Sequence, residues 1–474
     1  MGYVINGVRH QRVFNIFEDI CAIPHGSGNE AAVAQYIVNY AKDKGCEAII
    51  DSENNVFVKK PAPAGCEGNE AILLQGHTDM VCEKNADTVH DFMRDGLKLF
   101  VEDGKIGAEG TTLGADNGIA VAYMLSLLSE DTKYPLELLF TVCEETGLEG
   151  AKSFDVSHIK AKKMINLDSE EDNVVTAGCA GGIRTNITLD LEYVGKADGV
   201  KVKICGLAGG HSGAEINSGK SSAVSLMGRL LAMLDADCNI QLSGVECNGK
   251  DNAIARECVS YVAGDIDAIS SACAKFEAET KKELAAVDCG FKVEVTEIGK
   301  INILSPECKD KVVSLLACAR CGVLKMSNDI AGLVEYSRNL GTIRCSHEKL
   351  EFIFSSRSSI EAQLDASIRE MDALARALGA KCAHYERYPG WEYKAVSPLR
   401  DAYVEAYRGL FGDMPTVGVI HAGLECGIIS DKLCGDIDII SVGPNLSDIH
   451  SPSERADIAS CERIYDILLS MLCK

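Results

Sequence analysis

Leu74-Gln75-Gly76-His77-Thr78-Asp79-Met80-Val81 directly follows a short apolar run at residues 71–73. An apolar run of this length that ends in polar residues predicts a buried strand, with His77 and Asp79 at its carboxyl end. An imidazole in that place can bind a metal ion, and a carboxylate two residues further on can hold the ring through its second nitrogen. The stretch therefore indicates a sheet with a ligand site at its edge.

Strand-like apolar runs alternate with helix-like segments through the first third of the chain. Residues 136–143 and 163–167 are further apolar runs, whereas residues 30–44 and 118–128 have helical spacing. Strands separated by helices predict an α/β fold with a mostly parallel sheet and helices on both faces. In such sheets, ligands bind at the carboxyl ends of the strands.

The pattern changes near residue 184 and changes back near residue 388. Between these points, alternating strands such as residues 350–355 combine with helices such as residues 360–378. This combination predicts an inserted α+β lid domain. Since 474 residues are too many for one core, we expect a catalytic domain formed by residues 1–184 and 388–474, with the lid at residues 185–387.

Composition limits the possible partners and the location. The formal charge of −23 argues against nucleic acid and anionic membranes, because both attract basic surfaces. The 21 cysteines lack the spacing of a disulfide framework. We find no signal-peptide pattern at the N-terminus and no apolar run long enough to span a bilayer. A cytoplasmic protein with reduced thiols is the expectation.

Further acidic residues follow apolar runs or lie in a glycine-rich turn, and His450 comes near the end of the chain. Any one of them alone is more often a capping, turn or surface residue. As a set, however, they offer the nitrogen and oxygen donors that two divalent metal ions need. We expect His77 and Asp168 on one ion, Glu145 and His450 on the other, and Asp116 between them.

The chain resembles the aminoacyl-histidine dipeptidases (cytosol non-specific, or carnosinase-like, dipeptidases), a family of dinuclear zinc metallopeptidases. The matching stretches occur in family order over nearly the whole chain: residues 75–81, 112–118, 143–151, 166–171, 209–213, 250–254, 420–427 and 449–452. The resemblance implies hydrolysis of dipeptides such as Xaa-His. An N-acyl amino acid amidohydrolase on the same site is the alternative, and a non-catalytic peptide-binding homologue is a more distant one.

The resemblance also implies a role for each residue of the site. His77, Asp116, Glu145, Asp168 and His450 correspond to the ligands of two metal ions, with Asp116 as the bridge. Zinc is the expected metal, with cobalt and manganese left open. Asp79 corresponds to the carboxylate that orients His77. Glu144 corresponds to the general base, which takes a proton from a water that bridges the ions and passes it to the leaving amine.

Three residues of the inserted domain correspond to substrate contacts. His211 resembles a donor to the developing oxyanion, and Asn252 and Arg357 are candidates for binding the terminal carboxylate of a small peptide. The resemblance further implies a homodimer and a cis peptide bond between Asp116 and Asn117. Whether His211 serves the site of its own chain or that of a second subunit stays open.

Overall fold

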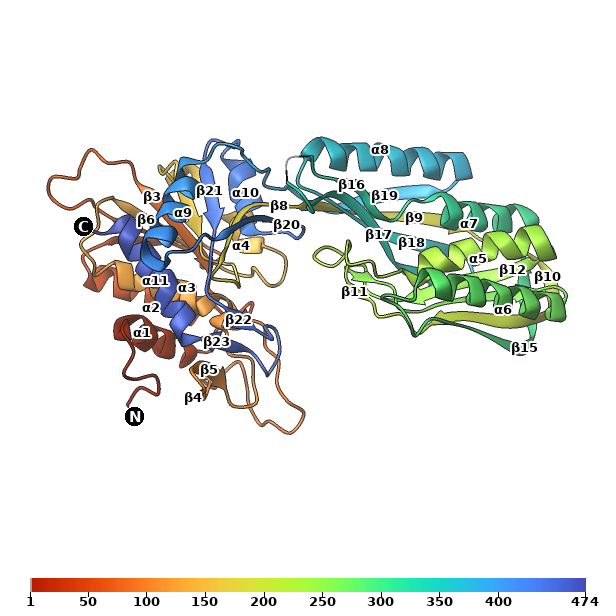
Figure 1. Ribbon diagram of the computed structural model, residues 1–474, viewed down its shortest axis with the longest axis horizontal. Coiled ribbons are helices and arrows are strands. Elements are labelled where there is room, and N and C mark those ends of the chain that lie inside the picture. Colours follow the sequence, from red (N-terminus) through yellow and green to blue (C-terminus); the bar gives the residue numbers. More distant parts are fainter. Residues whose placement is uncertain (1, 329) are drawn as a thin grey trace. The chain divides into compact units, whose positions relative to one another are not determined.

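The computed structural model describes residues 2–328 and 330–474 and divides the chain into two compact units (Figure 1). Unit 1 comprises Met1–Cys179, Trp391–Val419 and Leu424–Lys474, and unit 2 comprises Ala180–Gly390 and Ile420–Gly423. The boundaries expected from the sequence, 184/185 and 387/388, lie within a few residues of these. The short segment 420–423 was expected in the catalytic domain but clusters with unit 2.

An eight-stranded sheet forms the centre of unit 1, in the order β1-β2-β6-β3-β7-β21-β8-β20. The four strands β6, β3, β7 and β21 are parallel to one another, whereas β1, β2 and β8 pair in antiparallel fashion. The centre of the sheet is thus parallel, as predicted, and its flanks are antiparallel. The strands are β1 (Glu47–Ile50), β2 (Val56–Lys60), β3 (Ile72–His77), β6 (Leu136–Thr141), β7 (Lys163–Asn166), β8 (Val174–Cys179), β20 (Thr416–Ile420) and β21 (Asp438–Ser441).

Both faces of this sheet are covered, which explains why its central strands are continuously apolar. In β3, Ile72 and Leu74 belong to one core cluster and Leu73 to another, because neighbouring side chains point to opposite faces. The first cluster includes residues of α1 (Gln11–Cys21), α2 (Ala31–Asp43), α3 (Ala115–Leu127), α9 (Pro398–Phe411) and α11 (Ile458–Leu472). The second includes α10 (Glu425–Lys432) and residues 154–161, which follow α4 (Glu149–Ser153) and contain the 3₁₀ turn Val156–His158.

A smaller sheet of unit 1 has the order β22-β23-β5-β4. Its strands are β4 (Leu99–Glu102), β5 (Lys105–Ala108), β22 (Leu446–Ser447) and β23 (Arg455–Asp457). The pairing of β22 with β23 fixes both ends of the loop that contains His450. This small sheet therefore determines where the last candidate ligand of the chain lies.

Unit 2 is built on an antiparallel sheet with the path β15-β10-β14-β12-β17-β18-β9-β19, to which β16 is added beside β17. Along β10, Val200, Val202 and Ile204 are buried in the core of unit 2 and the intervening lysines are more exposed. Such alternation indicates that one face packs against helices while the other meets water. Helices α5 (Ala223–Cys238), α6 (Ile266–Glu283), α7 (Pro306–Cys318) and α8 (Glu361–Leu378) supply that core (Figure 1).

The strands of the large sheet in unit 2 are β9 (Gly181–Asp190), β10 (Tyr193–Cys205), β12 (Gln241–Asn248), β14 (Cys258–Ala263), β15 (Lys292–Leu304), β16 (Gly322–Met326), β17 (Val334–Cys345), β18 (Lys349–Ser358) and β19 (Lys381–Tyr388). A separate two-stranded ladder joins β11 (Gly210–His211) to β13 (Ala253–Ile254). The mixed sheet of unit 1 and the α+β character of unit 2 agree with the fold class that was predicted.

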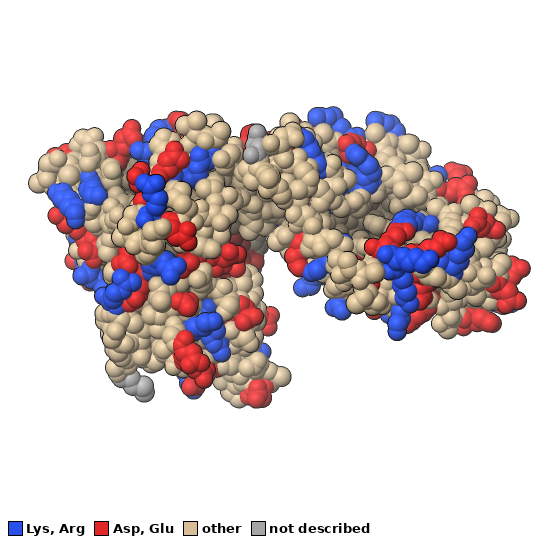
Figure 2. All heavy atoms as spheres, viewed as in Figure 1, with Lys and Arg blue, Asp and Glu red and all other residues tan. Residues whose placement is uncertain are grey.

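On the face shown in Figure 2, lysine and arginine side chains lie among acidic ones in both units. All 21 cysteines are free thiols. Among the described residues, no helix has the length and apolar character needed to cross a membrane.

Candidate active site

Three neighbouring parallel strands of unit 1 bring most of the candidate ligands to one edge of the sheet. The strands lie in the order β6-β3-β7, so their carboxyl ends are adjacent. His77 is the last residue of β3, Glu144 and Glu145 follow the end of β6, and Asp168 follows the end of β7. This is the edge at which parallel sheets bind ligands.

Asp116 and His450 reach this edge from other elements. Asp116 lies in the first turn of α3, and its peptide bond to Asn117 is cis, as the resemblance implied. His450 lies in the loop between β22 and β23 and has a left-handed backbone, with φ of 58°. The site thus combines strand ends, a helix start and a loop that are far apart in sequence.

Glu454 fixes the loop of His450 to the start of α3. Its buried carboxylate accepts hydrogen bonds from the backbone N–H groups of Leu113, Gly114 and Ala115, at 2.7, 3.1 and 2.9 Å. A helix start has N–H groups without helical partners and attracts negative charge. The loop and the helix start that hold His450 and Asp116 are therefore connected directly.

The five candidate ligands form two groups that share Asp116. In one group, His77 Nε2 lies 3.1 Å from Asp116 Oδ1 and 3.3 Å from Asp168 Oδ1. In the other, His450 Nε2 lies 3.3 Å from Asp116 Oδ2 and 2.9 Å from Glu145 Oε1. Each oxygen of Asp116 therefore faces one group, which is the arrangement that a bridging carboxylate requires.

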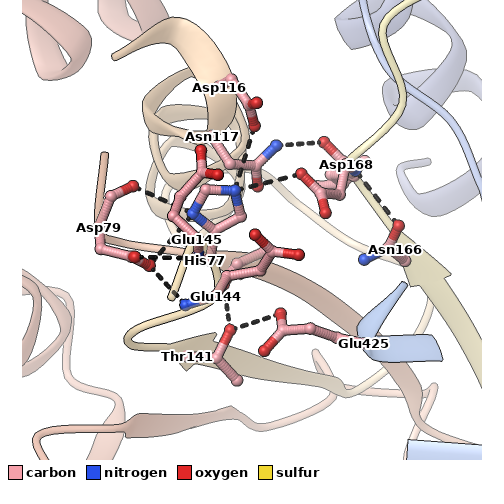
Figure 3. A network of polar contacts seen from close by, with 12 residues as sticks. His77, Asp79, Asp116, Asn117, Thr141, Glu144, Glu145, Asn166, Asp168 and Glu425 are labelled. Atoms are coloured by element: carbon pink, nitrogen blue, oxygen red, sulfur yellow. Dashed lines mark hydrogen bonds and ion pairs between the residues drawn. The ribbon is translucent and has the colours of Figure 1, made fainter. Parts of the chain in front are cut away.

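Asp79 holds both His77 and the segment that contains the two glutamates (Figure 3). Its Oδ1 lies 3.3 Å from His77 Nδ1, which leaves Nε2 of the ring to face the carboxylates. Oδ1 also accepts a hydrogen bond from the backbone N–H of Glu144 at 3.0 Å, and Oδ2 accepts one from that of Glu145 at 3.3 Å. One buried carboxylate thus positions three members of the site.

The electrostatics of the site favour positive charge. Burial opposes protonation of His77, but the carboxylates of Asp168, Asp116 and Asp79 outweigh burial and raise its pKa. Hydrogen bonds with Asp116 and Glu145 raise the pKa of His450 to about 10. Both imidazoles thus become cationic where no other cation balances the acids.

The acidic groups of the site also lack enough positive charge around them. Burial, with added repulsion from Asp168, Glu425 and Glu145, raises the pKa of Glu144 well above its usual value. Burial also raises the pKa of Asp168 to about 7. Carboxylates that crowd together in a buried place need cations nearby to stay ionised.

The donor set matches what two divalent cations require. Imidazole nitrogens and carboxylate oxygens suit zinc, and they also suit manganese and cobalt. The two groups have three donors each once Asp116 is counted in both, which leaves room for water and substrate at either position. The residues present therefore fit a pair of metal ions.

A chain of buried polar side chains below the site was not predicted from the sequence. Glu425 is fully buried at the start of α10 and accepts a hydrogen bond from Thr141 Oγ1 at 2.7 Å and another from Gln75 Nε2. Gln75 Oε1 in turn accepts one from Asn166 Nδ2 at 2.6 Å. These contacts tie together the ends of β6, β3 and β7. The signal in the sequence was the glutamine inside an otherwise apolar strand.

The remaining predicted residues, His211, Asn252 and Arg357, belong to unit 2. His211 Nδ1 accepts a hydrogen bond from the backbone N–H of Ala214 at 3.0 Å. Burial and the nearby Arg357 lower the pKa of His211, so the ring is neutral near pH 7 and carries its proton on Nε2. Asn252 lies close to His211, because the backbone carbonyl of Asn252 accepts a hydrogen bond at 2.9 Å from the N–H of Ser212, the residue after His211.

Arg357 and His421 extend this group. A Cβ added to Gly213 would lie 3.0 Å from His211 Cε1 and 3.2 Å from Arg357 Nε, and closer still to the carbonyl oxygen of His421. His421 is buried, and Ser337 Oγ lies 2.7 Å from its Nε2. No role for His421 was predicted from the sequence, and the structure places this residue beside two predicted substrate contacts.

Residues 73–474 match Peptidase family M20/M25/M40. The chain belongs to this family. It is 36% identical over 471 residues to the cytosol non-specific dipeptidase of Escherichia coli (strain K12), which covers 98% of this chain and 97% of that protein. These matches confirm the family that the motifs indicated.

Solved structures of the family agree with the fold. The aminoacylhistidine dipeptidase of Vibrio alginolyticus has a TM-score of 0.91 and 32% identity, with 99% of this chain and 98% of that chain covered. A tripeptidase from Staphylococcus aureus has a TM-score of 0.59 at 16% identity over 98% of each chain, and shows a shared fold only. The family assignment and the fold are therefore established.

Proposed function

We propose that this protein is a metal-dependent dipeptidase that hydrolyses Xaa-His and other dipeptides. The observation that carries the proposal is the position of Asp116, whose two carboxylate oxygens face two separate groups of nitrogen and oxygen donors. Support also comes from relatives of nearly the same length whose names state dipeptidase activity, one of them in the cytosol. We propose the same location for this chain.

His77 and Asp168 would hold one divalent cation, Glu145 and His450 the other, and Asp116 would hold both. Bound there, the cations would polarise the scissile carbonyl and lower the pKa of the attacking water. We propose zinc, since imidazole and carboxylate ligands with an open position are typical of catalytic zinc.

Glu144 is the proposed general base. It is neighbour to Glu145 but belongs to neither donor pair, and the hydrogen bond from its N–H to Asp79 fixes its backbone. Its carboxylate would take a proton from the attacking water and deliver it to the amine that leaves. Its high pKa in the absence of cations would fall when positive charge is bound nearby, which returns it to the basic form.

His211 and Arg357 supply the groups that substrate recognition needs. The Nε2–H of a neutral His211 can donate to the oxygen of a carbonyl as negative charge develops on it. The Arg357 guanidinium, which donates to the Tyr388 hydroxyl at 2.9 Å, can bind a carboxylate through its remaining N–H groups. We propose that Asn252 assists in the same recognition.

Chelator-treated protein tested on a substrate panel would check the proposal. Zinc, cobalt and manganese are added back singly, and turnover is measured on Xaa-His and other dipeptides, on tripeptides and on N-acetyl amino acids. We expect hydrolysis of dipeptides that depends on added metal. Faster turnover of N-acetyl amino acids than of any dipeptide would instead establish an amidohydrolase.

A further inference from the structure

A second group of metal-binding side chains lies in unit 2, at the edge strand of its sheet. Cys382 and His384 are two residues apart on β19, so both point to the same face of the strand. Asp372 comes from α8, which packs against β19. The sulfur, nitrogen and oxygen atoms of these residues all lie within 4.8 Å of one another.

The distances match the edges of a tetrahedral zinc site. Zinc bonds of about 2.3 Å to sulfur, and of about 2.0–2.2 Å to nitrogen and oxygen, place sulfur about 3.6 Å from nitrogen and nitrogen about 3.3 Å from oxygen. Cys382 Sγ lies 3.6 Å from His384 Nε2. His384 Nε2 lies 3.1 Å from Asp372 Oδ1. Two edges of the site thus agree with these values, and the third, from Cys382 to Asp372, is at most 4.8 Å.

The contacts of His384 orient the ring as a metal ligand would be oriented. Its Nδ1 lies 2.9 Å from Thr185 Oγ1, on the neighbouring strand β9. Nε2 therefore faces Cys382 and Asp372 together. Without a metal ion, Asp372 is the shared hydrogen-bond partner of His384 Nε2 and of the Cys382 thiol. A ring held at Nδ1 with ligand atoms gathered at Nε2 is the usual arrangement of a metal-binding histidine.

We propose that Asp372, Cys382 and His384 bind an exchangeable Zn²⁺ ion, with water as its fourth ligand. Thiolate and imidazole together favour zinc over magnesium, calcium and manganese. The side chains of Asp372 and His384 are 47% and 19% exposed, so the ion can enter from solvent. Cys382 binds as the thiolate and releases its proton to water. The ion would connect α8 to the edge strand β19.

Cobalt substitution separates this site from the one in unit 1, because the five candidate ligands there include no sulfur. Excess Co²⁺ is added to the chelator-treated full-length protein, and the thiolate-to-cobalt charge-transfer band is followed in the near ultraviolet. We expect the band in the wild-type protein and its loss in Cys382→Ser and His384→Ala. Cys345→Ser is the matched control, since Cys345 is an exposed cysteine of the same sheet, and should keep the band.

Zinc stoichiometry gives an independent readout. The wild-type protein should bind one more equivalent of zinc than Cys382→Ser, with dipeptide turnover equal in the two proteins. Asp372→Asn changes a half-exposed position and should fold even if the other variants do not; we expect its apparent zinc affinity to fall by at least tenfold at this one site. Absence of the band in the wild-type protein, or its persistence in Cys382→Ser, would overturn the proposal.

Discussion

Glu144 and Glu145 are adjacent in sequence but differ in surroundings. Glu145 Oε1 lies 2.9 Å from His450 Nε2, within one donor group. Glu144 is buried, and the negative charges of Asp168 and Glu425 lie nearby. Burial and these charges raise its pKa. A general base has to lie close to the metal ligands without being a ligand itself, and Glu144 satisfies both conditions (Figure 3).

Glu144→Gln should lower the turnover number by about 10²–10⁴-fold, because an amide of similar shape cannot accept the proton. The metal content, measured by elemental analysis, should stay at the wild-type value. Glu149→Gln is the matched control, since it changes an exposed glutamate of the same segment. If Glu144→Gln kept wild-type turnover at saturating metal, Glu144 would not be the general base.

His421 makes the stability of unit 2 depend on pH. Burial, followed by the charges of Arg357 and His211, lowers its pKa to about 3. The folded protein therefore keeps this ring neutral, whereas the unfolded chain protonates it below about pH 6.5. The stability contributed by the neutral ring is present above pH 6.5 and is lost as the pH falls towards 3.

His421→Gln should remove this dependence, because glutamine does not titrate and can still accept a hydrogen bond from Ser337. Between pH 7 and pH 5 we expect the wild-type protein to lose on the order of 2 kcal/mol of unfolding free energy that the variant retains. Urea unfolding at a series of pH values measures the difference. His347→Gln, at an exposed site, is the control. If the unfolding free energy changed with pH in the same way in wild type and His421→Gln, His421 would not be the source of the pH dependence.

Four of the five candidate ligands could be picked out because they follow an apolar run or lie in a glycine-rich turn, whereas His450 lies in a mostly polar loop. Glu425 and Glu454 could not be picked out, because a glutamate in a loop or at a helix start gives no sign of being buried. Glu454 acts on backbone N–H groups of residues some 340 positions away in sequence. Only the folded chain shows that contact.

At the scale of elements, the close approach of β3 to α3 sets the position of Asp116. Gly76 is the point of contact: a Cβ there would lie 3.0 Å from Ala120 Cβ and closer still to Asn117 Oδ1. Asn117 also donates a hydrogen bond to the Leu167 carbonyl at 2.8 Å, which ties the start of α3 to the segment before Asp168. Crowding at Gly76 would disturb both groups of candidate ligands.

Gly76→Ala should lower the unfolding free energy by about 1–3 kcal/mol, as overpacking does in a dense core. It should also weaken metal binding, because Asn117 and its neighbour Asp116 have to shift. Urea unfolding and metal titration measure the two effects. Gly68→Ala is the control, since nothing lies within 4 Å of a Cβ at that exposed turn; equal effects of the two substitutions would exclude this explanation.

The sequence predicted the central strands and most helices because their apolar periodicity is strong. It predicted less well the flanks of the sheet in unit 1, where β1 and β2 pair in antiparallel fashion. Direction of pairing depends on partners that are distant in sequence, and the residues of β1 are mostly exposed. Short strands without a buried face give little pattern to detect.

At the scale of the whole molecule, the chain has two units with separate hydrophobic cores. Metal binding at the site in unit 1 should therefore stabilise that unit alone, since ligands stabilise the fold that binds them. The single tryptophan, Trp391, is buried in a core cluster of unit 1. Its fluorescence reports the unfolding of that unit specifically.

Chelation should lower the unfolding midpoint seen by Trp391 fluorescence. Mn²⁺ should raise the unfolding free energy of unit 1 again, by about 3 kcal/mol for each bound ion at a hundredfold excess over its dissociation constant. Manganese is chosen because it binds poorly to thiolates such as Cys382. Far-ultraviolet circular dichroism should show a second transition that Mn²⁺ leaves unchanged. A single transition that shifts as a whole would show that the two units unfold together.

Division into two units was predictable from the change of pattern near residues 184 and 388. That residues 420–423 belong to unit 2 was not predictable, because four residues between a strand and a helix give no compositional signal. Their place depends on backbone hydrogen bonds from Ala180 to Ile420 and Ala422. Contacts of this kind are visible only in three dimensions.

Anomalous diffraction at the zinc edge, from crystals grown with zinc, tests the central claim most directly. Two peaks should lie roughly 3.5–4 Å apart on either side of the Asp116 carboxylate, one beside His77 and Asp168 and the other beside His450 and Glu145. A single peak, or none between these residues, would contradict the account of a two-metal peptidase.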